Sequence, residues 1–388
     1  MTYAMEGLLR EYTIILRMFT SKHSYVLFSL MMLLILIAPA SAQQTQWTKS
    51  TGNPILSPTA WDPGGLVRPR VLYEGTTFRM WYSGMDMNDN LVGIGYATST
   101  DGSNWVANSQ PVLEASSSSW EGSYVSIGSV LWNGSVFTMY YRGVGGQAGT
   151  VEANGAVGLA TSPDGVTWTK YSGNPVMRAT GSADSELLST PYVIQTGGSY
   201  KMWYTCENPV LAQVAICYAS SSDGKTWSKN SSPVLMPGSG WESTALYSPS
   251  VIFDGTTYGM WYTGENQTQF YGIGYATSKD GVTWVKSPNN PILSNGPAAW
   301  DQGGVENPCV IQYNDTYLLY YDGFGVANNI TYIGMAKSPA NFVLPEFNPS
   351  FTAMITLLVA SATILSGESS RKNNHPKPLS NKTYRKHH

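Results

Sequence analysis

The hydrophobic and polar positions from residue 44 to residue 342 follow a pattern of short strands that returns five times along the chain. Stretches rich in Tyr, Trp, Val and Ile, such as "YGMWYTG" and "GIGYATS", are separated by tight turns such as "DGTT" and "EGTT". Short runs of these residues between turns containing Gly, Asn or Asp are typical of antiparallel hairpins. The pattern therefore predicts an all-β body with little helix.

The clearest marker of the repeat is a Ser-x-Asp-Gly turn followed by a Trp. It reads "STDGSNW" (99–105), "SPDGVTW" (162–168), "SSDGKTW" (221–227) and "SKDGVTW" (278–284). One more step of about 58 residues toward the N-terminus reaches Trp47, in "WTKSTGNPIL", which closely matches "WTKYSGNPVM" at 168–177. Asp and Gly are residues that shape tight turns, so we interpret the four turns as structural.

Each repeat predicts four strands, the last of which carries the Trp. Four strands per unit, five units and a period near 58 residues predict a five-bladed β-propeller. The last unit has no Trp strand of its own. We therefore expect the N-terminal strand around Trp47 to complete the last blade, because closing the ring in this way protects the edge strands.

Length and charge narrow the classes of protein. A chain of 388 residues suggests two or three domains, but repeat architectures grow by adding units, so we predict one body over 43–342. Charged residues make up 12% of the chain and the net charge is −3. Few Lys and Arg in a weakly acidic chain disfavour nucleic acid as a partner class, and we expect none.

The N-terminal end predicts export. An apolar run at 25–38 follows basic residues and precedes the small residues "ASA", which predicts a signal peptide over 1–42 with cleavage after Ala42. The region before the run is long for such a signal. Translation from Met18 would give a more ordinary one, so we hypothesise that residues 1–17 are a start-site extension.

The C-terminal end predicts attachment to the cell surface. A linker at 343–350 contains Pro-Glu-Phe, a hydrophobic segment follows at 351–367, and the basic tail covers 368–388. The motif resembles the sorting signals of archaeal surface proteins, which are cut and replaced by a lipid anchor. A plain membrane-anchoring helix is the alternative, and a C-terminal core helix is disfavoured by the basic flank. The first two interpretations place the body outside the cell.

Two of the three cysteines predict a disulfide. Cys206 and Cys217 stand at two positions, on neighbouring strands, that hold Gly in the other four repeats. Such a paired exchange favours a cross-strand bond in an oxidising exterior. Cys309 is expected to be a buried thiol. The sequence has no Cys and His set with metal-binding spacing, so we expect no metal and no cofactor.

Carboxylates gather where the repeats are expected to open on one face. The loop before the first strand of each unit carries an acid, and so do most ends of the second strands. The first set is Asp62, Glu121, Glu186, Glu242 and Asp301, and the second is Asp86, Glu207, Glu265 and Asp322. A mouth rich in carboxylates and aromatic rings suits a carbohydrate, because acids bond hydroxyl groups and rings stack on sugar faces.

The Asn-Pro-x-Leu loops, the "MWYTG" strands and the "YATSxDGxxW" endings resemble the glycosidase propellers of glycoside hydrolase families 43, 32, 68 and 130, over about residues 44–342. The resemblance implies an exported glycoside hydrolase or phosphorylase that acts on oligosaccharides. It also implies a pair of catalytic carboxylates on the inner strands. Only Glu306, in "ENP", matches the acid motif, and a partner would come from a loop residue such as Asp62, Asp301 or Glu186.

Arg68 and Arg70 lie two residues apart on the first inner strand, which predicts side chains on one side of it. They are candidates to clamp an acidic or phosphorylated sugar, to neutralise the acidic mouth, or to pair with Glu306. We predict substrate contacts for both, together with Asp86, Glu207, Glu265, Asp301 and Asp322. The recurring acids of the loops have a scaffold interpretation as well. A surface glycan-binding or adhesive propeller without catalysis is therefore the alternative function.

Overall fold

The computed structural model describes residues 47–340, apart from 118–119, 147–149, 152, 181, 209–212 and 328–329. The described residues fall within one compact unit, Gln44–Asn341. The predicted signal peptide, the Pro-Glu-Phe linker, the hydrophobic segment and the basic tail all lie outside the described residues. Where the structure describes the chain, it contains no helix that is both long enough and apolar enough to cross a membrane.

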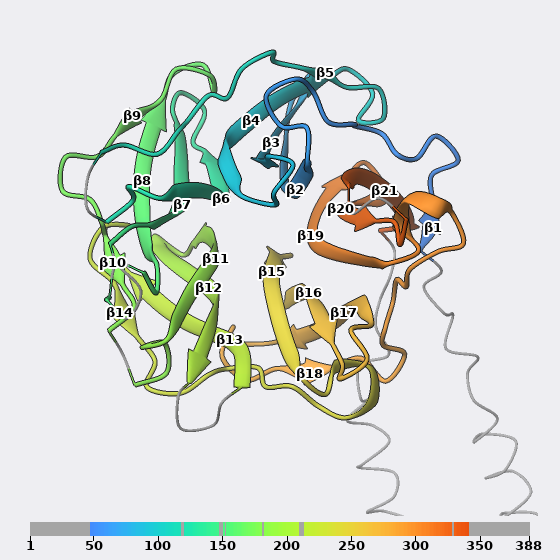
Figure 1. The fold of residues 1–388 in the computed structure, drawn as a ribbon. Coiled ribbons are helices and arrows are strands. Elements are labelled where there is room, and N and C mark those ends of the chain that lie inside the picture. The colour runs from blue at the N-terminus through green and yellow to red at the C-terminus, as the bar shows by residue number, and fades with distance from the viewer. Residues whose placement is uncertain are drawn as a thin grey trace, which may run out of the picture. The chain divides into compact units, whose positions relative to one another are not determined.

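The protein is all-β, as predicted. Its only helical elements between 47 and 340, gaps excepted, are two 3₁₀ turns, η1 (Gly240–Glu242) and η2 (Ala299–Asp301). The strands fall into five repeats of neighbouring antiparallel strands, shown in sequence around a common centre in Figure 1. The hydrogen-bonded strands form three sheets, of eight, five and eight strands, rather than one closed sheet.

The repeats have the following strands. Repeat 1 contains β2 (Gly65–Glu74), β3 (Thr77–Met85), β4 (Leu91–Ser99) and β5 (Val106–Ala107). Repeat 2 contains β6 (Tyr124–Trp132), β7 (Phe137–Val144), β8 (Ala156–Ser162) and β9 (Thr169–Lys170), with β10 (Met177–Arg178) also paired to β8. Repeat 3 contains β11 (Leu187–Thr196), β12 (Ser199–Asn208), β13 (Gln213–Ser221) and β14 (Ser228–Lys229). Repeat 4 contains β15 (Ala245–Phe253), β16 (Tyr258–Glu265), β17 (Tyr271–Ser278) and β18 (Val285–Lys286).

Repeat 5 contains β19 (Gly304–Tyr313), β20 (Thr316–Phe324) and β21 (Thr331–Pro339). Its fourth strand is β1 (Thr48–Lys49), which comes from the start of the described chain. Thr48 lies opposite Lys337, and Lys49 lies opposite Ala336, in an antiparallel pairing. In Figure 1 this blue strand lies beside the orange strands of repeat 5.

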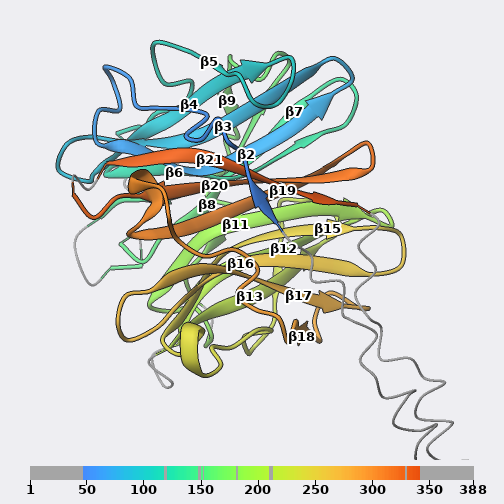
Figure 2. The ribbon, with the colours of Figure 1, turned by 90° about the vertical axis from the view of Figure 1, so that its right-hand side faces the viewer.

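The core lies between neighbouring repeats, whose sheets are stacked face to face in the side view of Figure 2. One buried cluster, for example, joins Trp81 of repeat 1 to Val125 and Phe137 of repeat 2. Aromatic side chains dominate these contacts because each buries a large apolar area. The Tyr- and Trp-rich strands of the sequence therefore hold the repeats to one another.

The four Asp-Gly turns fasten repeats 2, 3 and 4 to the repeat before each of them, and repeat 1 to repeat 5. A buried aromatic side chain on a second strand donates a hydrogen bond to the glycine carbonyl of the neighbouring turn. These bonds are Trp81 Nε1 to Gly165 O at 2.8 Å, Tyr140 Oη to Gly224 O at 3.0 Å, Trp203 Nε1 to Gly281 O at 2.8 Å, and Tyr320 Oη to Gly102 O at 3.0 Å. Within each turn the Asp carboxylate accepts backbone N–H groups, as Asp280 does from Val282 and Thr283. The turns are therefore structural.

Each first strand has an irregularity at the same place, next to the centre. The register shifts between Val67 and Arg70 in β2 and at the equivalent point of β6, β11, β15 and β19. In four repeats the residue before a proline has a positive φ: 59° at Arg68, 45° at Thr190, 51° at Ser248 and 52° at Asn307. Residues other than Gly rarely adopt this region, and such strain persists where surrounding contacts enforce it.

The contacts that enforce this geometry cross from one repeat to the next. The backbone N–H at the irregular point donates to a side-chain oxygen on the second strand of the preceding repeat. The four bonds are Ile127 N to Ser83 Oγ at 3.0 Å, Ser248 N to Thr205 Oγ1 at 3.0 Å, Asn307 N to Thr263 Oγ1 at 2.8 Å, and Arg68 N to Asp322 Oδ1 at 2.8 Å. The last bond joins repeat 5 to repeat 1.

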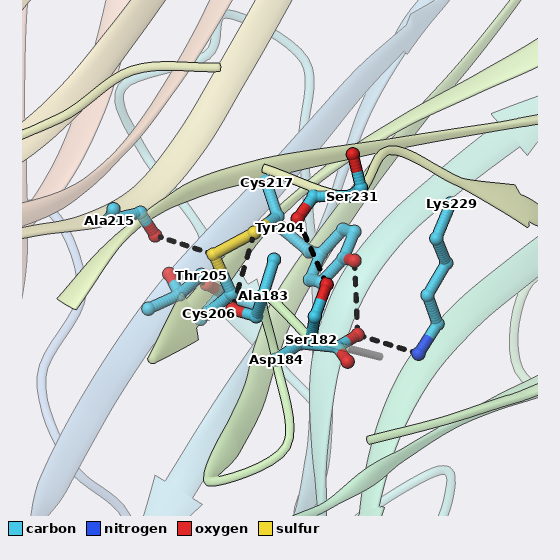
Figure 3. The surroundings of a disulfide bond; sticks show 11 residues. Ser182, Ala183, Asp184, Tyr204, Thr205, Cys206, Ala215, Cys217, Lys229 and Ser231 are labelled. Carbon is cyan, nitrogen blue, oxygen red and sulfur yellow. Dashed lines mark hydrogen bonds and ion pairs between the residues drawn. A yellow bond between two sulfur atoms is a disulfide. The ribbon is translucent and has the colours of Figure 1, made fainter. Parts of the chain in front are cut away.

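Cys206 and Cys217, the pair predicted from the sequence, form a disulfide with Cα atoms 5.8 Å apart (Figure 3). In repeat 1 the equivalent glycines, Gly84 and Gly95, leave no room for a side chain because Trp61 and Tyr82 pack on them. Repeat 3 has Ala183 where repeat 1 has Trp61, so the disulfide occupies the space that an indole fills elsewhere. Cys309 is a buried free thiol, as expected.

Candidate functional site

A central cluster of polar residues lies where the irregular first strands meet the second strands. We define it as Arg68, Glu265, Glu306, Asn307 and Asp322. Glu306 on β19 lies directly opposite Asp322 on β20 in the antiparallel register. Side chains at such positions lie on one face of the sheet, with Cβ atoms about 4.5–5.5 Å apart. The fold therefore brings two carboxyl groups together at the centre.

Asp322 is held firmly and is only 1% exposed. Its Oδ1 atom accepts the backbone N–H of Arg68 at 2.8 Å, and its Oδ2 atom accepts the amide of Asn307 at 3.0 Å. Burial raises the pKa of Asp322 to about 6, although these hydrogen bonds favour the charged form. Asp322 therefore anchors repeat 1 to repeat 5 and places a carboxyl group next to Glu306.

Glu306 is only partly buried, and its carboxyl group has no hydrogen bond or ion pair to any other residue that the structure describes. Its deep position in the protein raises its pKa to about 8, chiefly through desolvation and then through the nearby Asp322 carboxylate, while Arg68 opposes the rise. A carboxyl group with this pKa is mostly protonated at neutral pH. Glu306 can therefore donate a proton, as a general acid must.

Glu265 lies on the side of the cluster that repeat 4 provides. Its carboxylate accepts the hydroxyl of Tyr247 at 2.7 Å and the hydroxyl of Tyr271 at 3.1 Å. The ring of Tyr271 makes an edge contact with Phe324, with centroids 5.8 Å apart. Glu265 also contributes to the raised pKa of Glu306, so it lies close enough to act on it electrostatically. Carboxylate and aromatic groups thus adjoin the proposed acid.

Arg68 and Arg142 supply positive charge near the carboxyl groups. The Nε and Nη1 atoms of Arg68 are buried and have no hydrogen-bond partner among the described residues. Arg142 donates to the Leu188 carbonyl at 2.8 Å and to the Tyr124 hydroxyl at 2.6 Å. Burial lowers the pKa of Arg142, and the charge of Arg68 lowers it further, so the two guanidinium groups are near each other. Such a pair favours an anion.

Sequence reasoning missed Arg142 and the pairing of Asp322 with Glu306. The sequence feature that could have identified Arg142 and Asp322 is the residue after the buried Tyr on each second strand. In the five repeats this residue is Ser83, Arg142, Thr205, Thr263 and Asp322. Three of these residues are small hydroxyl residues. The Arg and the Asp depart from them, and both lie next to the centre.

Arg70 does not share the place of Arg68. The register shift between Val67 and Arg70 breaks the strand alternation, so the expectation of side chains on one side is wrong. Arg70 is buried and donates to the carbonyls of Gly128, Pro69 and Pro308. It therefore ties together the first strands of three repeats, and its predicted contact with substrate is disfavoured by its burial.

The acids of the loops that precede the first strands are scaffold residues in the structure. Asp62, Glu121, Asp184, Glu242 and Asp301 are all buried in their own repeats. Asp301, for example, pairs with Lys49 at 2.6 Å, and the Oδ1 atom of Asp62 accepts the Thr59 hydroxyl at 2.7 Å. Neither Asp62 nor Asp301 is exposed, which argues against the predicted catalytic role of the first and the predicted substrate contact of the second.

The remaining predicted residues lie outside the central cluster. Asp184 takes the scaffold position of repeat 3, and Glu186 is exposed just before β11. Asp86 shapes the turn after β3 by accepting the N–H groups of Asn88 and Asn90. Glu207 lies near the end of β12, opposite Leu187. Catalysis by Glu186 and substrate contacts of Asp86 and Glu207 stay predictions.

Two family models match the chain. Residues 57–235 match the N-terminal domain of glycosyl hydrolases family 32, and residues 198–289 match the β-1,4-mannooligosaccharide phosphorylases of glycoside hydrolase family 130. An uncharacterized protein of Mycobacterium tuberculosis (strain CDC 1551 / Oshkosh) is 32% identical over 265 residues, which cover 65% of this chain and 85% of that protein.

Characterised relatives share shorter stretches or the fold. The 1,2-β-oligomannan phosphorylase of Thermoanaerobacter sp. (strain X514) is 31% identical over 102 residues, or 24% of this chain and 34% of that enzyme. The solved structure of β-1,2-mannobiose phosphorylase from Listeria innocua superposes with a TM-score of 0.57 at 15% identity, covering 76% of this chain and 97% of that one. With the matched models and the repeat pattern, these similarities show that the chain belongs to the β-propeller glycosidase superfamily.

Proposed function

We propose that the protein cleaves an oligosaccharide at the central cluster, with Glu306 as the general acid and inorganic phosphate as the attacking group. The observation that carries this proposal is Glu306, a partly exposed carboxyl group at the centre that has no hydrogen bond among the described residues and whose pKa is raised to about 8. Its neighbour Asp322 is buried, and both of its oxygens already accept hydrogen bonds. Glu265 is partly exposed too, but its carboxylate already accepts two tyrosine hydroxyls, so Glu306 is the carboxyl group of the cluster that a substrate can engage without breaking a hydrogen bond.

One free acid suits phosphorolysis better than hydrolysis. Hydrolysis of a glycosidic bond uses two carboxyl groups, one to protonate the leaving oxygen and one to act as a base or nucleophile. Phosphate is itself a nucleophile and needs no base. The unpartnered nitrogens of Arg68, with Arg142 beside it, offer the charge and donors that phosphate oxygens bind.

In the proposed reaction Glu306 donates its proton to the glycosidic oxygen as the bond between that oxygen and the anomeric carbon breaks. A phosphate oxygen forms the new bond to the same carbon. The products are a sugar 1-phosphate and an oligosaccharide shortened by one unit, and the Glu306 carboxylate regains its proton from solvent. The raised pKa of Glu306 keeps its carboxyl group protonated before each turnover.

The similarity to mannooligosaccharide and mannobiose phosphorylases supports β-mannosides as the first substrates to test. The purified chain is incubated with β-1,2- and β-1,4-mannooligosaccharides, with and without phosphate, and sugar 1-phosphate is measured by ³¹P NMR. We expect product only with phosphate. Release of free mannose without phosphate would show a hydrolase and overturn the choice of nucleophile.

Two matched variants locate the acid. Glu306→Gln removes the proton donor and is expected to abolish product formation, while Glu186→Gln changes an exposed carboxyl group outside the cluster and is expected to leave it intact. The reverse result would move the acid to Glu186. Arg68→Ala is expected to raise the KM for phosphate more than the KM for the sugar.

A non-catalytic glycan-binding protein is the second candidate, and the burial of Asp62 and Asp301 favours it because neither can serve as the second catalytic carboxylate. This second candidate predicts no turnover with or without phosphate. It predicts retention on a glycan array, which Arg68→Ala weakens. Retention that is unchanged in this variant would place binding elsewhere.

We also infer that the five repeats form a five-bladed propeller closed by β1. The pairing of β1 with β21, the bond from Arg68 to Asp322 and the bond from Tyr320 to Gly102 support this inference.

Export and anchoring at the cell surface remain proposals that rest on the end segments of the sequence. Cell fractionation and protease treatment of intact cells test export and anchoring at the cell surface.

A further inference from the structure

Four repeats contain the same buried ion pair at the loop before the first strand. A lysine on the fourth strand reaches the loop carboxylate of its own repeat. The pairs are Lys170 and Glu121 at 2.7 Å, Lys229 and Asp184 at 2.6 Å, Lys286 and Glu242 at 2.5 Å, and Lys49 and Asp301 at 2.6 Å. Figure 3 shows the pair of repeat 3, with Tyr204 bonded to the same carboxylate.

The surroundings of each ammonium group are also repeated. Each one donates a second hydrogen bond to a backbone carbonyl of the loop, as Lys49 does to Gly296 at 2.9 Å and Lys286 to Met236 at 2.7 Å. Three of the four lie 5.8–5.9 Å from the centre of the neighbouring Tyr ring. This part of a repeat is therefore a site for one positive charge, made of a carboxylate, a carbonyl and a tyrosine.

Repeat 1 lacks the lysine of this arrangement. Its fourth strand places Ala107 opposite Ala97, in the same register that places Lys170 opposite Ala160 in repeat 2. Repeat 1 keeps the carboxylate of Asp62 and the tyrosine, Tyr82. The methyl group of alanine cannot supply a charge to either.

Without the lysine, the buried carboxylate of repeat 1 has no ion pair with any described residue. Asp62 and Tyr82 are both fully buried and interact with each other, as the carboxylate and tyrosine of the other repeats do, but no described residue brings a cation to the Asp62 carboxylate. Thr59 holds the Oδ1 atom of Asp62 through its N–H and hydroxyl, which fixes the direction of Oδ2. Buried polar groups, and charges above all, are normally paired.

We propose that repeat 1 binds a potassium ion beside the Asp62 carboxylate, at the place where repeats 2 to 5 hold a lysine ammonium group. One carboxylate balances one positive charge, so a monovalent ion suits the site. The described residues offer no group of three or more His, Cys, Asp or Glu side chains, which a divalent ion would favour. Potassium is close to an ammonium group in size, and the oxygens present are ligands for a hard cation.

Thermal unfolding of the full chain tests this proposal. Melting temperatures are compared in KCl, NaCl and choline chloride at equal ionic strength, with the KCl concentration varied to obtain a Kd from the stabilisation. We expect a melting temperature a few degrees higher in KCl than in choline chloride, with a smaller effect of NaCl. Equal melting temperatures in the three salts would overturn the proposal.

Two substitutions at position 107 distinguish a cation bound in repeat 1 from a general effect of salt on the protein. Ala107→Lys supplies the ammonium group from the chain, so it is expected to raise the melting temperature in choline chloride and to remove the potassium effect. Ala107→Met has a similar length without charge, so it is expected to remove the potassium effect without stabilising. A potassium effect that persists in Ala107→Lys would place the ion elsewhere.

A proton on Asp62 is the alternative to a bound cation, since burial raises the pKa of this carboxyl group. It predicts stabilisation by Ala107→Lys at neutral pH but no response of the natural chain to potassium. That combination would overturn the potassium site. Crystals soaked in thallium, a heavy substitute for potassium, give a direct readout: an anomalous peak within bonding distance of Asp62 Oδ2 supports the site, and its absence in crystals with thallium bound elsewhere contradicts it.

Discussion

Two adjacent residues of each second strand behave in opposite ways. The first is a buried Tyr in all five repeats, Tyr82, Tyr141, Tyr204, Tyr262 and Tyr321, and it faces the scaffold carboxylate of the loop. The next residue is Ser83, Arg142, Thr205, Thr263 or Asp322, and it faces the neighbouring first strand. Successive side chains of a strand point to opposite faces.

Each second strand therefore has two faces, a Tyr face toward the loop carboxylate and a central face toward the neighbouring first strand, and we infer that the first serves stability and the second serves chemistry. The Tyr face repeats because every repeat buries a loop carboxylate beside its Tyr. The other face is free to vary where it reaches the centre, and repeat 5 places Asp322 there opposite Glu306. Changes on the Tyr face should therefore affect folding, and changes on the central face should affect activity.

The largest expected effect on stability comes from breaking one of the buried ion pairs between a fourth-strand lysine and a loop carboxylate. Lys170→Ala leaves Glu121, which is 2% exposed, without its cation, and removing one partner of a buried pair costs about 3–5 kcal/mol. Because Lys170 is itself partly exposed, we expect the lower end, measured by urea unfolding. The exposed Lys279→Ala serves as the control. An unchanged unfolding midpoint for Lys170→Ala would show that the network is dispensable.

In repeat 3 the disulfide takes the place of the Trp packing found in the other repeats. Substitutions at this position test whether Trp packing can in turn replace the disulfide. Replacing both Cys206 and Cys217 by Gly is expected to cost about 2–3 kcal/mol, the chain-entropy value for a loop of this size. Adding Ala183→Trp should recover part of the loss, because the other repeats pack an indole on these glycines. No recovery would mean that the space around Ala183 differs.

The pH dependence of activity tests the role of the central face. Glu306 must be protonated to act as the acid, so activity should fall as pH rises through about 8. Asp322→Asn removes a nearby negative charge that helps raise the pKa of Glu306, and this alkaline limb should then move to lower pH. Asp86→Asn, in a turn outside the cluster, is the control. A limb that stays in place in Asp322→Asn would contradict the electrostatic coupling.

The same pKa values predict how stability depends on pH. The folded protein holds protons on Glu306 and Asp322 more tightly than the unfolded chain does, because both pKa values are raised to about 8 and about 6. Their stabilising contribution is fully present below the unfolded values near 4 and is lost as pH rises through the folded values. In Glu306→Gln the melting temperature should therefore decline less between pH 5 and pH 8.5 than in the natural chain.

The smallest expected effect is the loss of one hydroxyl from the Tyr face. Tyr262→Phe removes the bond to Glu242 at 2.8 Å and the bond from Asn290 at 3.0 Å, while Lys286 still pairs with the carboxylate. A cost of about 1 kcal/mol is expected in urea unfolding, with activity unchanged. A loss of activity at unchanged stability would break the proposed separation of the two faces.

The strand repeat was predictable from the sequence because it depends on local rules. Turn residues and alternating apolar residues recur with a fixed spacing, and each repeat carries the same set. The disulfide was predictable for the same reason, since aligned repeats show two glycines exchanged for two cysteines. The structural role of the Asp-Gly turns followed from the chemistry of Asp and Gly alone.

The candidate site was predictable only in part. The "ENP" motif pointed to Glu306, yet the pairing of Asp322 with it depends on the register of β19 and β20, which no local pattern specifies. The acids of the loops were expected at the mouth because they precede the innermost strands. The structure buries all of them except Glu186, and lysines from distant parts of the chain and tyrosines of the second strands pair with most of the buried ones.

The all-β repeat, the positions of the repeated strands and the residues that shape the turns could be read from the sequence, since these follow from interactions among near neighbours. Which charges are paired, which central carboxyl group has no hydrogen bond and which buried carboxylate lacks a cation could not, because burial and pairing depend on side chains brought together from distant parts of the chain. Lys49 and Asp301, 252 residues apart, are the plainest case.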